Sequence, residues 1–226
     1  MVMKRYAAPK FWPIEKKTKK YVIDPSPGPH AKKMCLPLGV ILRDVLKYAE
    51  TLEEVKEILN NCIVKIDKRV RKDHKFPVGL MDIITIGDDS YRVLPNKHGF
   101  YLQKTNSGNI KLLRVENKKY VGKKVQLNLH DGKNILIDKN NYKTGDTLLF
   151  DLDKGSFDSM SMGKGATALV VFGRNVGRVG KIEEITVMEG SKITQITINS
   201  DGVMLIIPKN YVFVIGENKP VIELGE

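Results

Sequence analysis

The 226-residue sequence has little of what metal proteins and most enzymes need. It contains two cysteines, Cys35 and Cys62, and no C-x-x-C pair, so the spacing of a zinc ribbon is missing. The four histidines are scattered along the chain without metal-ligand spacing. No G-x-S-x-G, H-E-x-x-H or Walker motif is present. We therefore expect no metal, no cofactor, no small-molecule substrate and no enzymatic activity.

Paired carboxylates are the remaining candidates for acid–base chemistry. Asp88–Asp89 and Glu183–Glu184 are predicted at turn-like or strand-edge positions, without a basic or hydroxyl partner nearby in the sequence. A solvated face explains each pair better than a catalytic site does.

Long apolar segments are also missing. The chain does not open with a basic-then-apolar signal peptide, and it contains no run of 18 apolar residues. We expect a soluble, cytoplasmic protein with reduced thiols and no membrane partner.

Positive charge is what the sequence has in excess. The net charge is +12 and the pI is about 9.5. Residues 1–37 hold nine Lys and Arg against two Asp and Glu, whereas residues 177–226 hold five against seven. An excess of this size favours a polyanionic partner such as nucleic acid. A tail that only increases solubility is the alternative.

Residues 1–35 show no sustained helical or strand period and contain five prolines. A segment of this composition buries too little apolar surface to fold alone, which predicts an extended arm that orders on a partner. Trp12, the single tryptophan, could stack on a base or fill a notch on the folded body. Both interpretations stay open.

Two helices are predicted after the arm. Residues 38–50 carry apolar side chains with the spacing of an amphipathic helix. Thr51 and Glu54 form a capping box that opens a second helix in "LEEVKEILNN". A hairpin with its turn at Asp67–Lys68 follows, and "MDIITI" is predicted as a returning strand.

From about residue 99 onward, short runs rich in β-branched residues alternate with turns. Strands of this length and spacing favour small barrels over a parallel sheet. The composition changes near residues 161–164. The predicted fold class is a multidomain α+β protein, with a small helical and β domain followed by β-rich domains.

A basic surface is predicted around the first helix and the hairpin. Arg43 and Lys47 are four residues apart, so a continuous helix would present both from one edge. If Val70 points into the core, Arg69 and Arg71 point to the opposite face, because side chains alternate along a strand. Such a surface could straddle a phosphate backbone. An ordinary charged surface is the alternative.

The stretch "FGRNVGRVGKI" places glycines at 173, 177 and 180. Their spacing matches neither the dinucleotide fingerprint nor the P-loop. The stretch is similar to a KOW motif, a glycine-punctuated strand–loop–strand in a small RNA-binding barrel. Residues 35–73 resemble the αL-type RNA-binding domain of ribosomal protein four.

Both motifs, together with "AAPKFW", "GPH", "CLPL", "FPVGLMDII" and "FVIGENKP", resemble the archaeal and eukaryotic-type small-subunit ribosomal protein four family. The resemblance implies a basic arm over 1–35, the RNA-binding domain over 36–98, a central β domain over 99–163 and a KOW barrel over 164–226. Lys68 stands where the family often has glycine, which puts a positive-φ turn in doubt. The long basic tail of eukaryotic members is not seen after "FVIGENKP", which favours an archaeal source.

The expected function is a structural, non-catalytic constituent of the small (30S) ribosomal subunit, with small-subunit rRNA and neighbouring ribosomal proteins as partners. An RNA-modifying enzyme and a dissociable KOW-type factor are the alternatives. The side chains expected to contact RNA are Lys4, Arg5, Lys10, Lys16, Lys17, Lys19, Lys20, His30, Lys32, Lys33, Arg43, Lys47, Lys68, Arg69, Arg71, Lys72, Lys164, Arg174, Asn175 and Arg178.

Overall fold

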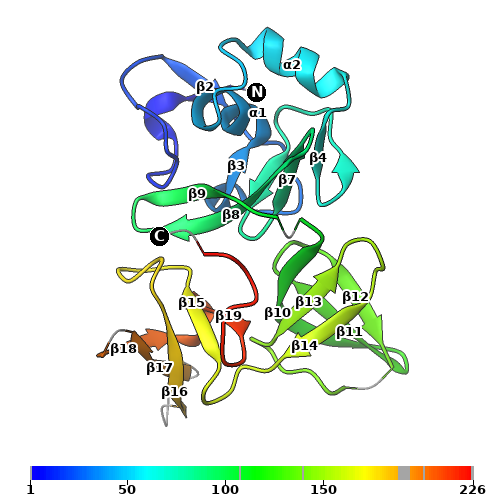
Figure 1. Ribbon diagram of the computed structural model, residues 1–226, viewed down its shortest axis with the longest axis vertical. Helices are drawn as coiled ribbons and strands as arrows, with labels where there is room; N and C mark the ends of the chain where they lie inside the picture. Colours follow the sequence, from blue (N-terminus) through cyan, green and yellow to red (C-terminus); the bar gives the residue numbers. More distant parts are fainter. Residues whose placement is uncertain (1, 107, 139, 188–193, 201, 225–226) are drawn as a thin grey trace. The chain divides into compact units, whose positions relative to one another are not determined.

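The computed structural model describes residues 2–106, 108–138, 140–187, 194–200 and 202–224. The chain forms two compact units, unit 1 (Met1–Lys111) and unit 2 (Leu112–Glu226). Both are built mainly from antiparallel strands, with little helix (Figure 1). No helix among the described residues is long and apolar enough to cross a membrane.

Unit 1 is organised around one five-stranded antiparallel sheet in the order β5-β4-β7-β8-β9. Two short strand pairs, β1 with β2 and β3 with β6, accompany it. The strands of the unit are β1 (Val2–Lys4), β2 (Tyr21–Ile23), β3 (Cys35–Pro37), β4 (Val64–Ile66), β5 (Arg69–Val70), β6 (Pro77–Gly79), β7 (Ile83–Ile86), β8 (Asp89–Asn96) and β9 (Gly99–Lys104).

The second predicted helix is confirmed as α2 (Leu52–Asn60). The backbone N–H of Glu54 donates to the Thr51 hydroxyl at 3.2 Å, as a capping box requires. On the opposite side of the box, the Glu54 carboxylate accepts a bond from the Glu50 N–H at 2.9 Å. Val55 and Leu59 are fully buried, which anchors the apolar face of α2 in the core of unit 1.

The helix predicted over residues 38–50 is confirmed only as far as Val45. α1 covers only Leu38–Val40 and continues as a π-helical turn over Ile41–Val45. Lys47 then takes a left-handed backbone conformation with φ of 57°, which no right-handed helix contains. The apolar stripe is still buried at its start, since Leu38, Ile41 and Leu42 are fully enclosed.

The N-terminal segment is not the extended arm that its composition predicts. Trp12 is only 3% exposed and belongs to the core cluster of unit 1, so it fills a notch on the folded body. The rings of Phe11 and Phe100 meet edge to face at 5.0 Å. A Cβ on Gly99 would lie 1.9 Å from the Phe11 carbonyl oxygen, so only glycine lets these two segments of the chain approach this closely. Apolar partners distant in the sequence therefore order this segment.

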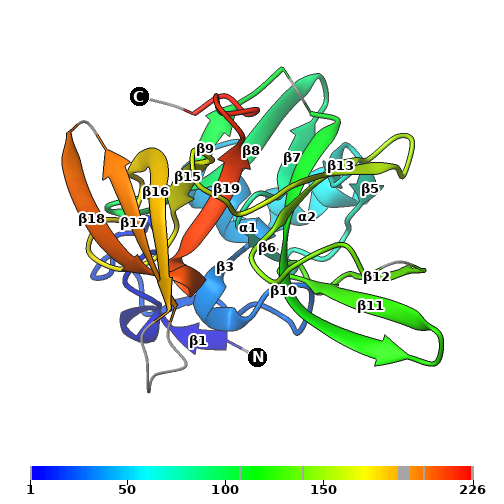
Figure 2. The same ribbon diagram turned by 90° about the horizontal axis from the view of Figure 1, so that it is seen from below.

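Unit 2 contains two five-stranded antiparallel sheets, in the orders β12-β11-β10-β13-β14 and β18-β17-β16-β15-β19 (Figure 2). The strands are β10 (Ile110–Val121), β11 (Lys124–Leu129), β12 (Asn134–Ile137), β13 (Thr147–Asp151), β14 (Phe157–Met160), β15 (Thr167–Val170), β16 (Val179–Val187), β17 (Thr194–Ser200), β18 (Val203–Pro208) and β19 (Val212–Gly216). In the second sheet β18 and β19 are the two edges, so a closed KOW barrel stays a prediction.

One buried arginine joins the two sheets of unit 2. Arg114, on β10, donates to the carbonyl oxygens of Asn210 and Val212 at 2.9 and 3.1 Å. Its guanidinium also lies 5.9 Å from the centre of the Phe213 ring, at the start of β19. Because these bonds satisfy backbone groups of the other sheet, Arg114 acts as a structural residue here.

The predicted boundary between residues 98 and 99 divides a hairpin. β8 and β9 pair from Asn96 and Gly99 outward, so both strands belong to one sheet. Sequence reasoning placed residue 99 in the next domain because the β-rich composition begins there. The predicted boundary near residues 163–164 falls between β14 and β15, where one sheet of unit 2 ends and the other begins.

Candidate nucleic-acid interface

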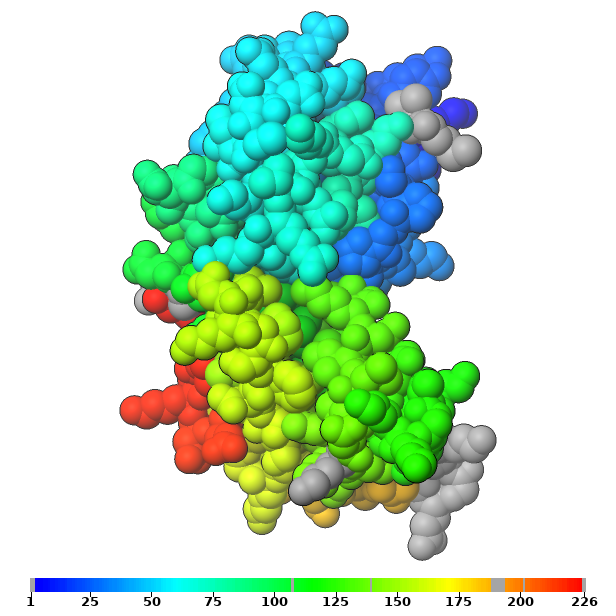
Figure 3. All heavy atoms as spheres, turned by 90° about the vertical axis from the view of Figure 1, so that its right-hand side faces the viewer, coloured from blue at the N-terminus to red at the C-terminus, as the bar shows by residue number. Residues whose placement is uncertain are grey.

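The turn between β4 and β5 opens a basic stretch of unit 1, with four Lys and Arg among residues 68–72. Asp67 and Lys68 both have positive φ, 49° and 65°. The chain therefore makes a tight positive-φ hairpin turn here even though the turn contains no glycine. The Asp67 N–H donates to the Ile83 carbonyl at 2.9 Å, and the Asp67 carboxylate accepts from the Ile83 N–H at 3.3 Å. These bonds fix the turn against β7, and Lys68, Arg69 and Lys72 are exposed. The part of unit 1 coloured cyan, around residues 50–70, lies at the surface in Figure 3.

The assumption that Val70 points into the core is wrong. Val70 is 43% exposed, and β5 contains only two residues. Arg71 is half-buried, with its guanidinium 4.3 Å from the centre of the Phe76 ring. Arg69 is therefore exposed, while much of Arg71 is occupied by packing against an aromatic ring.

Arg43 and Lys47 do not form the expected pair on one helical edge. Arg43 lies in the π-helical turn and makes an ion pair with Asp44 at 2.8 Å. Lys47 comes after the helical residues, where its positive φ changes the direction of the chain. Lys47 is exposed, but the spacing of four residues no longer places it beside Arg43.

Two of the side chains expected to contact RNA are buried, so these two predictions are wrong. Arg5 is 4% exposed, and its Nε donates to the carbonyl oxygen of Glu15. His30 is 7% exposed, and its Nε2 lies 2.9 Å from a carboxylate oxygen of Asp82. The Arg5 bond lies within the N-terminal segment, whereas His30 joins this segment to Asp82, so neither side chain faces a partner.

The other N-terminal candidates lie at the surface. Lys16 is half-buried and donates to the Ala8 carbonyl at 3.0 Å, and Lys32 makes an ion pair with Asp24 at 2.5 Å. The exposed candidates of this segment are Lys4, Lys10, Lys17, Lys19, Lys20, Lys32 and Lys33.

A buried ionic cluster lies beneath the hairpin turn. The ammonium of Lys111, whose side chain is 1% exposed, contacts carboxylate oxygens of Asp67 and Asp82, each at 2.6 Å. Burial raises the pKa of Asp82, but Lys111 and His30 lower it more, and the net pKa lies well below its ordinary value. The cluster ties the basic turn, the N-terminal segment and the start of β10 together.

Sequence reasoning missed this cluster. One signal was available, because Lys111 is a lone lysine inside the apolar run "NIKLLRV". A cation at such a position is buried, and a buried cation needs acidic partners. Those partners, Asp67 and Asp82, are far away in the sequence, so composition alone could not identify them.

The glycines of "FGRNVGRVGKI" are explained by the fold of unit 2. Gly173 and Gly177 have φ of 86° and 85° in the loop between β15 and β16, where glycine is favoured. A Cβ on Gly180 would lie 2.3 Å from the Asn199 carbonyl oxygen, so this glycine lets β17 approach β16. The loop leaves Arg174 and Arg178 exposed and Asn175 half-buried.

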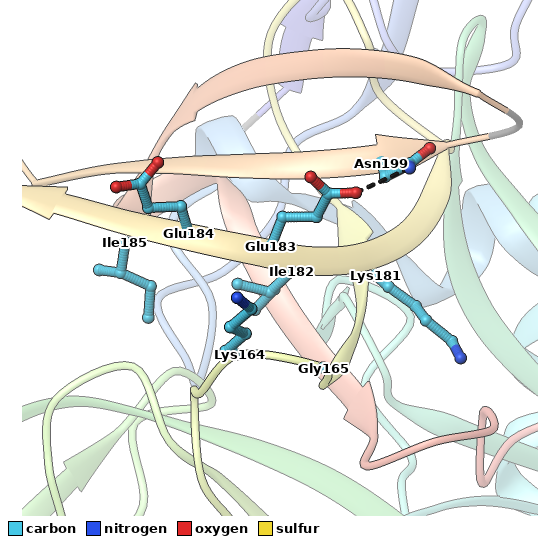
Figure 4. A pocket seen from close by; sticks show the side chains of 8 residues that line it. All are labelled: Lys164, Gly165, Lys181, Ile182, Glu183, Glu184, Ile185 and Asn199. Atoms are coloured by element: carbon cyan, nitrogen blue, oxygen red, sulfur yellow. Dashed lines mark hydrogen bonds between the residues drawn. The ribbon is translucent and has the colours of Figure 1, made fainter.

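Lys164 lines an open groove of about 920 Å³ beside β16. Figure 4 shows Lys164 and Lys181 together with Glu183 and Glu184, and the Glu183 carboxylate accepts a 2.8 Å bond from Asn199. Both signs of charge line this groove, so it does not present a uniformly basic surface.

Charge separates the two units. Unit 1 holds 22 Lys and Arg against 12 Asp and Glu, a net +10, and unit 2 holds 16 against 14, a net +2. The structure thus belongs to the class of multi-sheet, mainly antiparallel β proteins, with a strongly basic N-terminal unit.

Comparison with known proteins identifies the family. Ribosomal family S4e matches residues 87–157, and the RS4NT domain matches residues 3–33. The chain is 42% identical to small ribosomal subunit protein eS4 of Aeropyrum pernix, over 99% of this chain and 95% of that protein. It is 40% identical to the same protein of Archaeoglobus fulgidus, over 98% and 97%.

A solved structure agrees with these relatives. The crystal structure of 30S ribosomal protein S4e from Thermoplasma acidophilum matches with a TM-score of 0.70 and 32% identity, over 80% of this chain and 94% of that one. The chain belongs to the ribosomal family S4e, the small ribosomal subunit proteins eS4. The resemblance noted in the sequence is confirmed, and the protein is a structural constituent of the small ribosomal subunit.

Proposed function

We propose that unit 1 holds this protein on small-subunit rRNA through its exposed lysines and arginines. The observation that carries the proposal is the turn at Asp67–Lys68, which the buried Lys111 cluster fixes beneath an exposed basic stretch. A rigid turn presents Arg69 and Lys72 to phosphates without a large loss of conformational entropy on binding.

The role is scaffolding without catalysis. Each basic side chain that neutralises a phosphate releases condensed counterions, which favours binding and makes it depend on salt. Such contacts position the folded units on RNA and do not by themselves read sequence. Arg174 and Arg178 of the KOW-like loop supply a second contact, and neighbouring ribosomal proteins cover part of the remaining surface. The protein acts on the ribosome, in the cytoplasm.

Replacing Arg69 and Lys72 with alanine tests the proposal. The double variant should bind a small-subunit rRNA transcript more weakly, and the slope of log affinity against log salt should decrease by about two, roughly one for each lost phosphate contact. Affinity is measured by filter binding over a salt series, and folding is checked by the fluorescence of buried Trp12.

A variant with Lys119 and Lys123 replaced by alanine is the matched control, because it removes the same charge from exposed positions of unit 2. The proposal requires this control to keep the wild-type slope. Equal slopes for all three folded proteins would show that the hairpin does not contact RNA.

A further inference from the structure

Unit 1 contains a pocket of about 440 Å³ at the junction of the N-terminal segment and the helical region. Its size lies within the range of small-molecule sites, roughly 300–1,000 Å³. The pocket opens between β2, the π-helical turn, α2 and the chain that precedes β6. Its lining residues are Tyr21, Val22, Ile23, Arg43, Leu52, Lys56, His74 and Lys75.

Close backbone packing fixes the walls of this pocket. The Gly39 N–H donates to the His74 carbonyl at 2.8 Å, and the Ser26 N–H donates to the Lys75 carbonyl at 2.9 Å. A Cβ on Gly39 would lie 2.7 Å from Cδ1 of Ile23 and 3.1 Å from the His74 oxygen. Glycine at 39 thus brings β2 and the His74 segment together, so the pocket is preformed.

The pocket combines an apolar floor with a basic rim. Val22 and Ile23 are buried, and Leu52 is half-buried. On the rim, Lys56 is exposed and Lys75 is half-buried. This arrangement suits a ligand with a flat apolar part and a negatively charged part.

The remaining polar groups of the rim are held in place. Asp44 orients Arg43 through bonds of 2.8 and 3.4 Å, so the guanidinium is positioned before any ligand arrives. Burial lowers the pKa of His74, Asp73 opposes this, and Lys75 and Lys56 lower it further, so the net pKa lies below its ordinary value. The imidazole is therefore neutral at pH 7 and offers one donor and one acceptor, which suits the edge of a base.

An accessible aromatic ring forms part of the lining. Tyr21 is 50% exposed, and the ammonium of Lys20 lies 5.4 Å from the centre of its ring. Aromatic side chains beside basic groups are the usual platform for an unstacked base.

We propose that this pocket receives one unpaired nucleotide of RNA, with its base against Tyr21 and Leu52 and its phosphates on Lys56 and Lys75. The inference rests on the proposed rRNA-binding function and goes further, because it assigns a single-nucleotide site to unit 1. The pocket then distinguishes RNA with an extruded base from a fully paired stem, which phosphate contacts alone do not do.

The test uses the full-length protein and two RNA hairpins with the same stem, one of which carries a single bulged adenosine. The wild type should bind the bulged hairpin about tenfold more tightly. Tyr21→Ala should remove that preference and leave the affinity for the paired hairpin unchanged, whereas Tyr21→Phe should keep it. With 2-aminopurine at the bulge, emission in the complex should be higher for Tyr21→Ala than for the wild type, because stacking quenches it.

Tyr6→Ala is the matched control, since Tyr6 is a 78% exposed tyrosine in the same basic segment and does not line the pocket. It should behave as wild type.

Equal affinity for the two hairpins, or a preference that survives Tyr21→Ala, would overturn the proposal. AMP and poly-glutamate are tested as competitors against the bulged hairpin, with unlabelled RNA as the reference. If AMP or poly-glutamate displaces the hairpin at the same concentration as unlabelled RNA, the pocket is assigned to free nucleotides or to acidic peptides instead. If neither hairpin binds, the RNA-binding function itself fails, and the pocket proposal fails with it.

Discussion

The two units of this protein use nearly equal lengths of chain in different ways. Unit 1 carries a net charge of +10 and still encloses an ionic cluster around Lys111. Unit 2 carries a net +2, and its edge strand β18 leaves the apolar side chains of Val203, Met204 and Ile206 at least half exposed. From this difference we propose that affinity for a polyanion belongs mainly to unit 1, while unit 2 offers surface suited to protein neighbours.

The largest expected effect comes from breaking the ionic cluster of unit 1. Lys111→Met leaves the buried carboxylate of Asp82 and the partly buried carboxylate of Asp67 without their shared ammonium, which should lower the free energy of unfolding of unit 1 by about 3–5 kcal/mol. Trp12 is the single tryptophan and is buried in unit 1, so its fluorescence during denaturant unfolding reports on this unit.

The control for this variant is Lys124→Met, which removes an exposed ion pair with Asp138 in unit 2. An exposed pair contributes about 0–1 kcal/mol, so the Trp12 transition should not move. A Lys111→Met protein with a wild-type Trp12 transition would show that the cluster does not stabilise unit 1.

An intermediate effect is expected in unit 2. Gly180→Ala places a Cβ 2.3 Å from the Asn199 carbonyl oxygen and should destabilise the β16–β17 pairing by about 1–3 kcal/mol. Gly163→Ala is the matched control, because the nearest atom to its Cβ is 3.9 Å away. Hydrogen exchange should accelerate in β16 and β17 of Gly180→Ala only. Acceleration that extends to β4 and β7 would mean that the two units do not unfold separately.

The smallest expected effect is a difference in reactivity between the two thiols of unit 1. Burial raises the pKa of Cys35 to about 12, so almost no thiolate is present at neutral pH, whereas Cys62 is exposed. A thiol reagent should therefore modify one cysteine in the native protein and both after denaturation. Rapid reaction of Cys35 in the native state would contradict the packing of β3 against β6.

Local signals in the sequence predicted much of this fold. The capping box at Thr51 and Glu54 defined α2 correctly, because cap and helix are adjacent in the chain. The β-branched runs from residue 110 onward predicted most of the strands of unit 2 for the same reason. The hairpin of β8 and β9, with weaker alternation, was not identified.

Features that depend on distant partners were not predictable. Trp12 belongs to a core cluster most of whose members follow it by more than 20 positions, and His30 meets Asp82 across 52 residues. For the basic candidates, the sequence supplied the residue type but not the exposure, and so Arg5 and His30 were placed at the surface while they lie inside. Lys68, Arg69 and Lys72 were placed there correctly, because their turn is a local feature.

The most direct test of the account is lysine footprinting of the full-length protein with and without small-subunit rRNA, read by mass spectrometry after acetylation. The account predicts that rRNA protects exposed lysines of unit 1, such as Lys19 and Lys72, and leaves Lys119, Lys123 and Lys154 of unit 2 reactive. Protection confined to unit 2, or spread equally over both units, would contradict the claim that unit 1 holds the protein on RNA.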